Sequence, residues 1–342
     1  MRRDEQLERL DRIFDVLVIG GGATGLGVAL DSASRGYATL LVEARDFAQG
    51  TSSRSTKLVH GGVRYLERGD IKLVYEALHE RGRLIRNAPH LVHELRFLVP
   101  AYSAWQIPYY GIGLKAYDIL AGRLGLSRST VVGKKGATHL VPTIAQDGLK
   151  GGVIYSDAQF NDTRLAMILA RTAVEHGATI LNDAPVRSLK KDRGRIVGAV
   201  VEDTVSGRTY DIRARAVVNA TGVFSDAIRQ MDEPDTKPMM APSQGVHLIL
   251  DRSFLPSDAG ILIPKTDDGR VVFVIPWQGH TLAGTTDTEL PHPELEPTAH
   301  DDEIDFILEH VDRYLTRRPT RADVRAVFAG LRPLVRPADD GE

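Results

Sequence analysis

Apolar runs alternate with a helix-like stretch near the start of the chain. Residues 14–19 are mostly apolar and lead directly into three glycines, and residues 38–43 form a second short apolar run. A short continuous apolar run is typical of a parallel strand that is buried on both faces. Residues 24–35 between the two runs predict a helix. The pattern therefore predicts a strand–helix–strand unit at the beginning of the fold.

The rest of the chain alternates helices with many short strands. Apolar spacing predicts helices over residues 71–85, over a stretch that is capped by Asp162 and ends at Gly177, and over residues 302–315. No repeat and no long linker separates these elements, so we expect interleaved domains. Strands are predicted over residues 96–100, 153–155, 178–181, 195–202, 208–213, 216–220, 246–250, 260–263, 271–276 and 280–284.

Residues 105–126 form the most apolar long stretch. A helix that crosses a membrane needs about 20 predominantly apolar residues. Polar residues interrupt this stretch, so it is a poor membrane span and instead predicts an amphipathic helix. Such a helix can pack on a core or on another domain, or it can lie on a membrane surface. The interrupting residues are Gln106, Pro108, Lys115, Asp118 and Arg123.

Composition narrows the class of protein without naming a function. The chain has 342 residues, of which 42% are hydrophobic and 26% charged, as in an ordinary globular protein with about two domains. A formal net charge of -2 argues against general affinity for nucleic acid, which needs concentrated Lys and Arg. The absence of cysteine excludes disulfides, thiolate catalysis and Cys-ligated metal sites, and it fits a cytoplasmic location.

The strongest local motif is a glycine turn. Gly20, Gly22 and Gly25 form G-x-G-x-x-G directly after a predicted strand, and Glu43 ends the next strand. This order is typical of a dinucleotide site: the diphosphate lies at the helix N-terminus and the acidic residue binds ribose hydroxyls. Glu43 disfavours NADP, while the motif alone leaves NAD and FAD open. The predicted cofactor contacts here are Gly20, Gly22, Ala23, Thr24, Gly25, Glu43 and Ala44.

Residues 51–66 carry a second candidate cofactor segment. Five Ser and Thr side chains fall within residues 51–56, and a glycine pair, a His and an Arg-Tyr pair follow. Hydroxyls and backbone N–H groups suit a flat, polar ring system, and a glycine pair permits its close approach. A solvated Ser/Thr loop remains the alternative for this segment on its own. The predicted contacts are Thr51, Ser52, Ser53, Lys57, Leu58, His60, Gly61 and Gly62.

Seven short blocks, taken in order, resemble the FAD-dependent glycerol-3-phosphate dehydrogenase family. The resemblance runs from Phe14 to Leu334, and its most specific parts are Lys57-Leu-Val-His-Gly-Gly-Val-Arg-Tyr-Leu66 and Gly284-Thr-Thr-Asp287. It implies FAD as the cofactor. The blocks are residues 18–22, 51–53, 57–66, 218–222, 273–277, 284–287 and 330–334.

The resemblance also implies a fold. That fold is α/β and similar to D-amino-acid oxidase, with a Rossmann-like FAD-binding domain interleaved with a mostly antiparallel sheet domain that binds the substrate. We therefore assign residues 13–90, 151–230 and 325–342 to the FAD-binding domain, and residues 91–150 and 231–324 to the substrate domain.

The activity implied by the resemblance is oxidation of sn-glycerol 3-phosphate to dihydroxyacetone phosphate. Hydride passes from C2 to flavin N5, and the electrons pass on to quinone. Arg64, Tyr65 and Arg332 are expected to bind the substrate, because a phosphate dianion needs fixed cationic donors. Arg332 could alternatively polarise the C2 oxygen. The catalytic candidates are Arg332 and two histidines, His60 and His247, one of which would accept the C2 hydroxyl proton.

Further expectations concern the adenosine half of the cofactor and the partners. Thr221 and Gly222 end a strand that should return to the cofactor, although tight turn packing explains them almost as well. The family implies a peripheral protein on the inner face of the cytoplasmic membrane, and a homodimer is an added expectation. We expect no nucleic acid as a partner and no metal.

The chain departs from the family pattern after Gly341-Glu342. A glycine-rich block and a helical domain normally follow there, so we expect weak FAD binding and low activity from these 342 residues. Three other hypotheses stay open. They are an FAD enzyme for another small hydroxy acid or amine, a non-catalytic fragment, and an NAD dehydrogenase, which the segment 51–66 disfavours.

Overall fold

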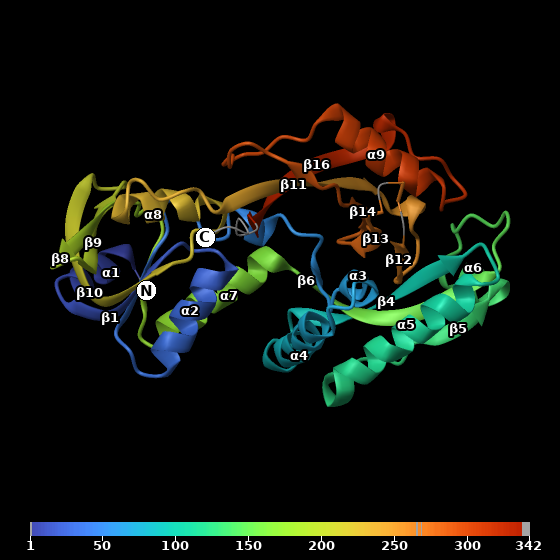
Figure 1. Ribbon diagram of the computed structural model, residues 1–342, viewed down its shortest axis with the longest axis horizontal. Helices are drawn as coiled ribbons and strands as arrows, with labels where there is room; N and C mark the ends of the chain where they lie inside the picture. The colour runs from blue at the N-terminus through green and yellow to red at the C-terminus, as the bar shows by residue number, and fades with distance from the viewer. Residues whose placement is uncertain (1, 265, 268, 337–342) are drawn as a thin grey trace.

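Two lobes, each built around its own sheet, make up the molecule (Figure 1). The computed structural model describes residues 2–264, 266–267 and 269–336. One lobe holds a six-stranded sheet in the order β7-β2-β1-β10-β9-β8. The other holds a ten-stranded sheet that includes β15-β11-β14-β13-β12-β4-β6-β3, with β16 paired to β11 and β5 paired to β6. An α/β fold of the predicted class is confirmed.

The smaller sheet contains the predicted strand–helix–strand unit. β1 (Ile13–Ile19) pairs in parallel with β2 (Thr39–Val42) and with β10 (Arg208–Asn219), and α2 (Ala23–Ser34) connects β1 to β2. β2 also pairs in parallel with β7 (Thr179–Leu181). Every residue of β2 is buried, as expected for a parallel strand that is covered on both faces.

The larger sheet is covered by helices on both faces. Alternate residues of β4 point to opposite sides, so Phe97 packs toward α4 and α5 whereas Leu98 packs toward α6 and α9. β11 pairs with β16 along almost its whole length and with β14 and β15 on its other side, so β16 is the edge strand here (Figure 1).

The remaining helices are α1 (Arg3–Leu7), α3 (Val63–Glu67), α4 (Ile71–Asn87), α5 (Gln106–Ala121), α6 (Lys134–Leu140), α7 (Asp162–Glu175), α8 (Ser225–Asp232) and α9 (Asp301–Asp312). The remaining strands are β3 (Leu58–Val59), β4 (Val92–Ala101), β5 (Thr130–Gly133), β6 (Gly151–Phe160), β8 (Val186–Asp192), β9 (Arg195–Asp203), β11 (Met240–Asp251), β12 (Gly260–Ile263), β13 (Val272–Trp277), β14 (His280–Gly284), β15 (Thr288–Glu289) and β16 (Val324–Val335).

Some local predictions differ from the structure. The strands expected at 208–213 and 216–220 are one continuous strand, β10, while β8 was not predicted. The cap of α7 is Asn161, whose side chain accepts a hydrogen bond from the Arg164 N–H, and Asp162 is the first helical residue. Asx side chains at both positions made the cap ambiguous from the sequence.

Strand pairing also departs from the domain assignment made from the sequence. β3, β6 and β16 pair within the ten-stranded sheet, although residues 13–90, 151–230 and 325–342 were all assigned to the FAD-binding domain. An apolar run shows that a strand is buried but not which sheet receives it. Residues 337–342 of that assignment lie outside the described residues, and the domain bounds themselves stay a prediction.

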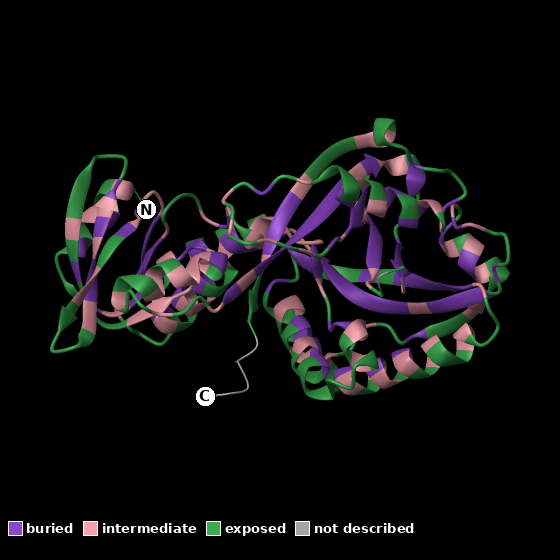
Figure 2. Ribbon diagram, turned by 45° about the horizontal axis from the view of Figure 1, so that its top comes forward, coloured by how far each residue is buried: buried purple, intermediate pink, exposed green. Residues whose placement is uncertain are grey.

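Helix α5 has one buried face and one exposed apolar face. Leu114, Tyr117 and Ala121 are buried and pack toward α4 and β6, as the packing hypothesis expected. On the other side Ile112 and Ile119 are 73% and 78% exposed. The helices on this side of the larger sheet show their outer surfaces along the lower edge of the larger lobe (Figure 2). Among the described residues, no helix is long and apolar enough to cross a membrane.

Candidate active site

The glycine turn after β1 has a conformation that only glycine fits well. Gly20 has φ +112°, and a Cβ atom there would lie 2.5 Å from the carbonyl oxygen of Ala220. A Cβ atom on Gly25 would lie 1.9 Å from the carbonyl oxygen of Gly20. The first glycine thus allows the sharp turn and the third allows close packing of α2 on the turn. The predicted partner turn at Thr221 lies directly against Gly20.

Backbone N–H groups gather at the N-terminus of α2. Gly22 caps this helix without a side-chain hydrogen bond, and the Ala23 N–H donates to Ser52 Oγ at 2.8 Å. Glu43 Oε2 accepts a hydrogen bond from the Gly21 N–H at 2.6 Å. The Gly21 and Ala23 N–H groups thus already have acceptors, and a phosphate would be bound by other N–H groups of the turn and by the positive dipole end of the helix. The exposed residues around the turn are Ala23, Thr24, Ala44 and Gly222.

The segment 51–62 connects this turn to a cavity in the larger lobe. Ser52 contacts the glycine turn, whereas Thr56, His60 and Gly62 line the cavity. Thr51 Oγ1 donates to the carbonyl oxygen of Leu331 in β16 at 2.5 Å, so the segment also contacts the edge of the large sheet. The two predicted parts of a flavin nucleotide site, the diphosphate turn and the ring-facing segment, are therefore joined in space.

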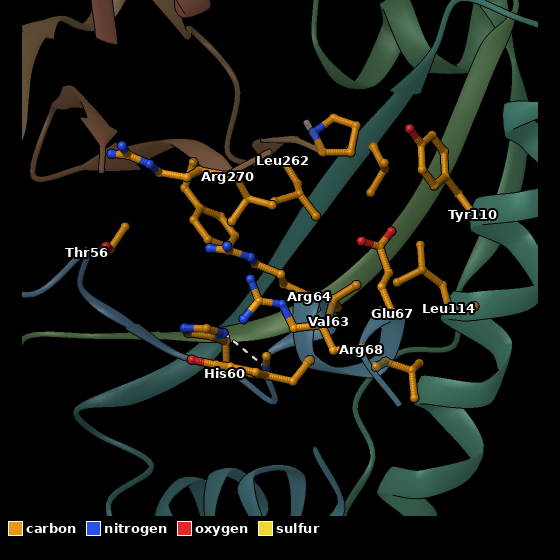
Figure 3. A pocket seen from close by; sticks show the side chains of 18 of the residues that line it. Thr56, His60, Val63, Arg64, Glu67, Arg68, Tyr110, Leu114, Leu262 and Arg270 are labelled. Atoms are coloured by element: carbon orange, nitrogen blue, oxygen red, sulfur yellow. Dashed lines mark hydrogen bonds between the residues drawn. The ribbon is translucent and has the colours of Figure 1, made fainter. Parts of the chain in front are cut away.

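The cavity has a volume of about 710 Å³ and brings the predicted substrate residues together. Arg64 and Tyr65 of α3 and Arg332 of β16 all line it. Figure 3 shows Arg64 between His60 and Arg270. Arg270, Arg68 and Tyr110 also line the cavity and were not predicted, because no motif surrounds them in the sequence. The high density of arginine predicts an anionic ligand.

Arg332 is held in place by four acceptors. Its Nη1 donates to the Gln244 carbonyl at 3.3 Å and to Asp287 Oδ1 at 3.2 Å. Its Nη2 donates to Thr285 Oγ1 at 3.2 Å and to the Thr286 carbonyl at 2.8 Å. Burial lowers the pKa of Arg332 from its ordinary value, although Asp287 acts in the opposite direction. An arginine remains charged under such conditions and offers a fixed planar group to an anion.

The two candidate histidines occupy different environments. His60 is exposed and lines the cavity, and its Nδ1 accepts a hydrogen bond from the Gly62 N–H at 3.1 Å (Figure 3). His247 is buried behind Thr56, with its Nε2 2.8 Å from Thr56 Oγ1 and its ring stacked on Phe328. Burial lowers the pKa of His247 to about 3, so this residue is a weak base at neutral pH.

Two residues of the predicted cofactor set are buried in structural contacts. Lys57 Nζ donates to both carboxylate oxygens of Asp162, at 3.0 and 2.8 Å, and to the Ser53 carbonyl at 2.6 Å. Leu58 belongs to the apolar core beneath the cavity. The structure thus places both in the packing that supports the segment 51–62, and a direct cofactor contact for either stays a prediction.

A buried charged network lies beneath the cavity segment. The Gly61 N–H donates to Tyr117 Oη at 2.7 Å, and Tyr117 Oη donates to Asp157 at 2.9 Å. Arg81 Nη1 donates to Asp157 Oδ1 at 2.6 Å. The three side chains come from α4, α5 and β6 and are 1–2% exposed. They fix the backbone next to His60, and nothing in the sequence linked them.

The residues present fit an FAD molecule. The turn at Gly20–Gly25 offers N–H groups for a diphosphate, and a Cβ atom on Gly22 would lie only 3.2 Å from Ser52 Oγ, so a side chain there would crowd the turn. The segment from Ser52 to His60 leads from that turn to the arginine-lined cavity. An FAD molecule with its diphosphate at the turn and its flavin ring at the cavity would fit both places.

Comparisons with known proteins agree with this geometry. The model of the FAD dependent oxidoreductase family matches residues 15–342. A glycerol-3-phosphate dehydrogenase, SDP6, mitochondrial, of Arabidopsis thaliana is 49% identical, covering 94% of this chain and 53% of that protein. A probable mitochondrial glycerol-3-phosphate dehydrogenase of Caenorhabditis elegans is 48% identical, with coverages of 94% and 46%.

A solved structure has a similar fold. The glycerol-3-phosphate dehydrogenase of Bacillus halodurans, determined with FAD, has a TM-score of 0.80 and 35% identity, covering 98% of this chain and 60% of that one. The chain spans about half the length of the curated relatives that it matches.

Proposed function

This chain belongs to the FAD dependent oxidoreductase family, and on that premise we propose that it oxidises sn-glycerol 3-phosphate to dihydroxyacetone phosphate with FAD as cofactor. The arginine-lined cavity at the end of the segment 51–62 is the observation that carries the proposal. Glycerol 3-phosphate is small and doubly charged, and its phosphate matches a cluster of guanidinium groups. The names of the relatives and of the Bacillus structure support the same substrate.

FAD, when bound, supplies the hydride acceptor for the C2 hydrogen of the substrate. The residues of the chain bind and orient the substrate and accept its proton. Arg64 and Arg332 bind the anionic substrate, and Tyr65 lines the same cavity. His60 is the better placed of the two histidines to accept the C2 hydroxyl proton, because it lines the cavity whereas His247 is buried. Since Nδ1 of His60 accepts the Gly62 N–H, proton uptake there requires that bond to open.

The electron acceptor and the location belong to the same proposal. A quinone is the acceptor, and the protein contacts the membrane surface through the exposed apolar face of α5. A second apolar cavity of about 570 Å³ lies on this face and is lined by residues that include Ile112, Ile119 and Val131. Exposed apolar surface of this kind favours interfacial binding. A cytoplasmic location and a homodimer stay predictions, and the curated relatives are named as mitochondrial.

The proposal is tested by purifying the chain, reading its flavin absorbance and measuring dye reduction with glycerol 3-phosphate. We expect a flavin spectrum after reconstitution with added FAD, and a rate that depends on the substrate phosphate. A Gly22→Val variant places a side chain where the diphosphate would approach and should lose the flavin. A panel that includes glycerol, a small hydroxy acid and an amine separates this activity from that of another FAD enzyme. A rate with the amine but none with glycerol 3-phosphate would refute the proposal.

Membrane contact gives a separate prediction. Ile119, on the outer side of α5, is 78% exposed, and Trp105, the N-cap residue of α5, is 63% exposed. Replacing Ile119 with Asp should weaken sedimentation with vesicles of phosphatidylglycerol and phosphatidylethanolamine by about tenfold, because a buried Ile side chain stabilises by roughly 1.5–3 kcal/mol. Trp105→Ser should act in the same direction.

A matched control for membrane contact is available in the smaller lobe. Val205, which lies between β9 and β10 and is not part of α5, is 68% exposed. Val205→Asp should leave vesicle binding unchanged. Equal binding by the wild-type chain and the Ile119→Asp variant would show that α5 does not contact the lipid.

A further inference from the structure

The residues 285–287, which we call the strap, hold Arg332 on one side. Thr285 Oγ1, the Thr286 carbonyl and Asp287 Oδ1 all accept hydrogen bonds from this guanidinium. Asp287 also accepts a hydrogen bond from Ser243 of β11. The orientation of Arg332 toward the cavity therefore depends on where the strap lies.

Glu303, in the first turn of α9, is a buried carboxylate outside the cavity. Its side chain accepts four hydrogen bonds. Oε1 accepts from Thr286 Oγ1 at 2.8 Å and from Thr288 Oγ1 at 2.7 Å. Oε2 accepts from Gln244 Nε2 at 2.7 Å and from the His300 N–H at 3.0 Å. Glu303 is 4% exposed and does not line the cavity.

Two residues connect Glu303 to Arg332. Gln244 and Thr286 each give a side chain to Glu303 and a backbone carbonyl to Arg332. Thr286 Oγ1 also accepts a hydrogen bond from the Val246 N–H at 3.0 Å, which fixes its rotamer against β11. One buried carboxylate thus holds both β11 and the strap, the two segments from which the main-chain acceptors of Arg332 project.

The charge of Glu303 is maintained by these contacts. Burial alone would raise the pKa of this carboxyl, but hydrogen bonds from His300, Thr288, Thr286 and Gln244 outweigh that effect and lower it. A carboxylate with several donors is ionised at neutral pH, and its hydrogen bonds are stronger than those of a neutral group. Helix capping needs only the bond to His300, so capping leaves the other three contacts unexplained.

We propose that Glu303 is a positioning residue for Arg332, acting through Gln244 and Thr286 to keep the guanidinium aimed at the substrate anion. The inference rests on the proposed function, since that function gives Arg332 its substrate. Glu303 does not touch the substrate, and its effect is transmitted through the carbonyl groups of two residues. A shift of about 1 Å in such a group costs up to roughly 100-fold in rate.

A double-mutant cycle tests this directly. The variants are Glu303→Gln, Arg332→Ala and the combination of both, compared with the wild-type chain. Gln keeps the size of the side chain, but its N–H₂ group replaces one carboxylate oxygen that accepts two hydrogen bonds, so donors would face donors there. We expect Glu303→Gln to lower kcat/KM for glycerol 3-phosphate by about tenfold, and to have almost no further effect when Arg332 is already alanine.

The control variant lies on the same helix. Glu309 is exposed and pairs with Arg313, so Glu309→Gln should leave kcat/KM unchanged. Gln244→Met provides a second route if Glu303→Gln unfolds, because it removes the contact to Glu303 while the Gln244 backbone remains. Melting temperature and flavin content are measured for every variant, so that loss of the fold is recognised.

A second readout separates this inference from the proposed function. Calorimetry gives the Kd of inorganic phosphate for the same four proteins without turnover. If the wild-type chain does not oxidise glycerol 3-phosphate, but Glu303→Gln weakens phosphate binding only when Arg332 is present, the proposed function fails and the inference stands. Equal effects of Glu303→Gln with and without Arg332 in both measurements would overturn it. The inference would also be overturned if replacing Arg332 changed neither phosphate binding nor turnover.

Discussion

We expect replacement of Arg332 by alanine to lower kcat/KM for glycerol 3-phosphate, the proposed substrate, by about 100-fold. Removing one fixed donor from a site that stabilises an anion costs roughly 10²–10³ in rate. Arg332 lines the cavity and its orientation is fixed by four acceptors, so little reorganisation accompanies binding. Steady-state dye reduction at several substrate concentrations gives kcat and KM separately.

A conservative variant and a control sharpen this test. Arg332→Lys keeps the charge but not the planar group that binds through two N–H donors, so it should recover only part of the lost activity. Arg325 lies on the same strand, is exposed and pairs with Asp251, and Arg325→Ala should have no effect on the rate. Flavin content should be the same in all variants, because neither residue contacts the glycine turn. An Arg332→Ala variant with normal kcat/KM would exclude Arg332 from the substrate site.

The largest expected effect on stability comes from the buried pair of Arg81 and Asp157. Their Nη1 and Oδ1 atoms are 2.6 Å apart, and both side chains are 2% exposed. Arg81→Met leaves the Asp157 carboxylate buried without its counter-charge, which typically costs about 3–5 kcal/mol of the free energy of unfolding. Urea denaturation followed by intrinsic fluorescence measures this loss. On the same α4 helix, Arg83→Met removes only an exposed pair with Glu80 and should change stability by less than about 1 kcal/mol.

The Arg81 effect should depend on pH. Burial raises the pKa of Asp157 above its ordinary value of 3.8, and Arg81 opposes this rise. Without Arg81 the folded-state pKa rises further, so the folded state holds a proton that the unfolded state has lost. The destabilisation by Arg81→Met should therefore grow as the pH rises from about 4 toward neutrality. A loss of stability that is the same at pH 4 and pH 7 would show that packing, rather than the unpaired charge, causes it.

The double replacement Arg81→Met with Asp157→Leu distinguishes the effect of this ion pair on stability from its effect on activity. Replacing both members of a buried pair by apolar residues is often neutral for stability. Stability should then return, but the Gly61 N–H keeps only its bond to Tyr117 Oη. If the network positions the segment at His60, activity should stay low in this stable variant.

Local chemistry is the part of this protein that the sequence predicted by itself. The glycine turn follows from residues within one strand–helix unit, because its φ angles and close contacts admit no larger side chain at Gly20 or Gly25. The hydroxyl-rich segment was predicted for the same reason, since its composition is local. Ser52 contacts the turn and Thr56 lines the cavity, while the cofactor contacts predicted for this segment stay predictions.

Contacts between distant strands were decided only by the tertiary structure. The predicted membership of residues 325–335 in the FAD-binding domain differs from the observed pairing of β16 with β11, because apolar alternation does not specify a partner strand. That pairing brings Arg332 to the strap and, through Gln244, to Glu303. Similarly, burial rather than residue type separates His247 from His60, since one packs behind Thr56 and the other lines the cavity. Residue type sets what a side chain can do, and long-range packing sets which side chains meet.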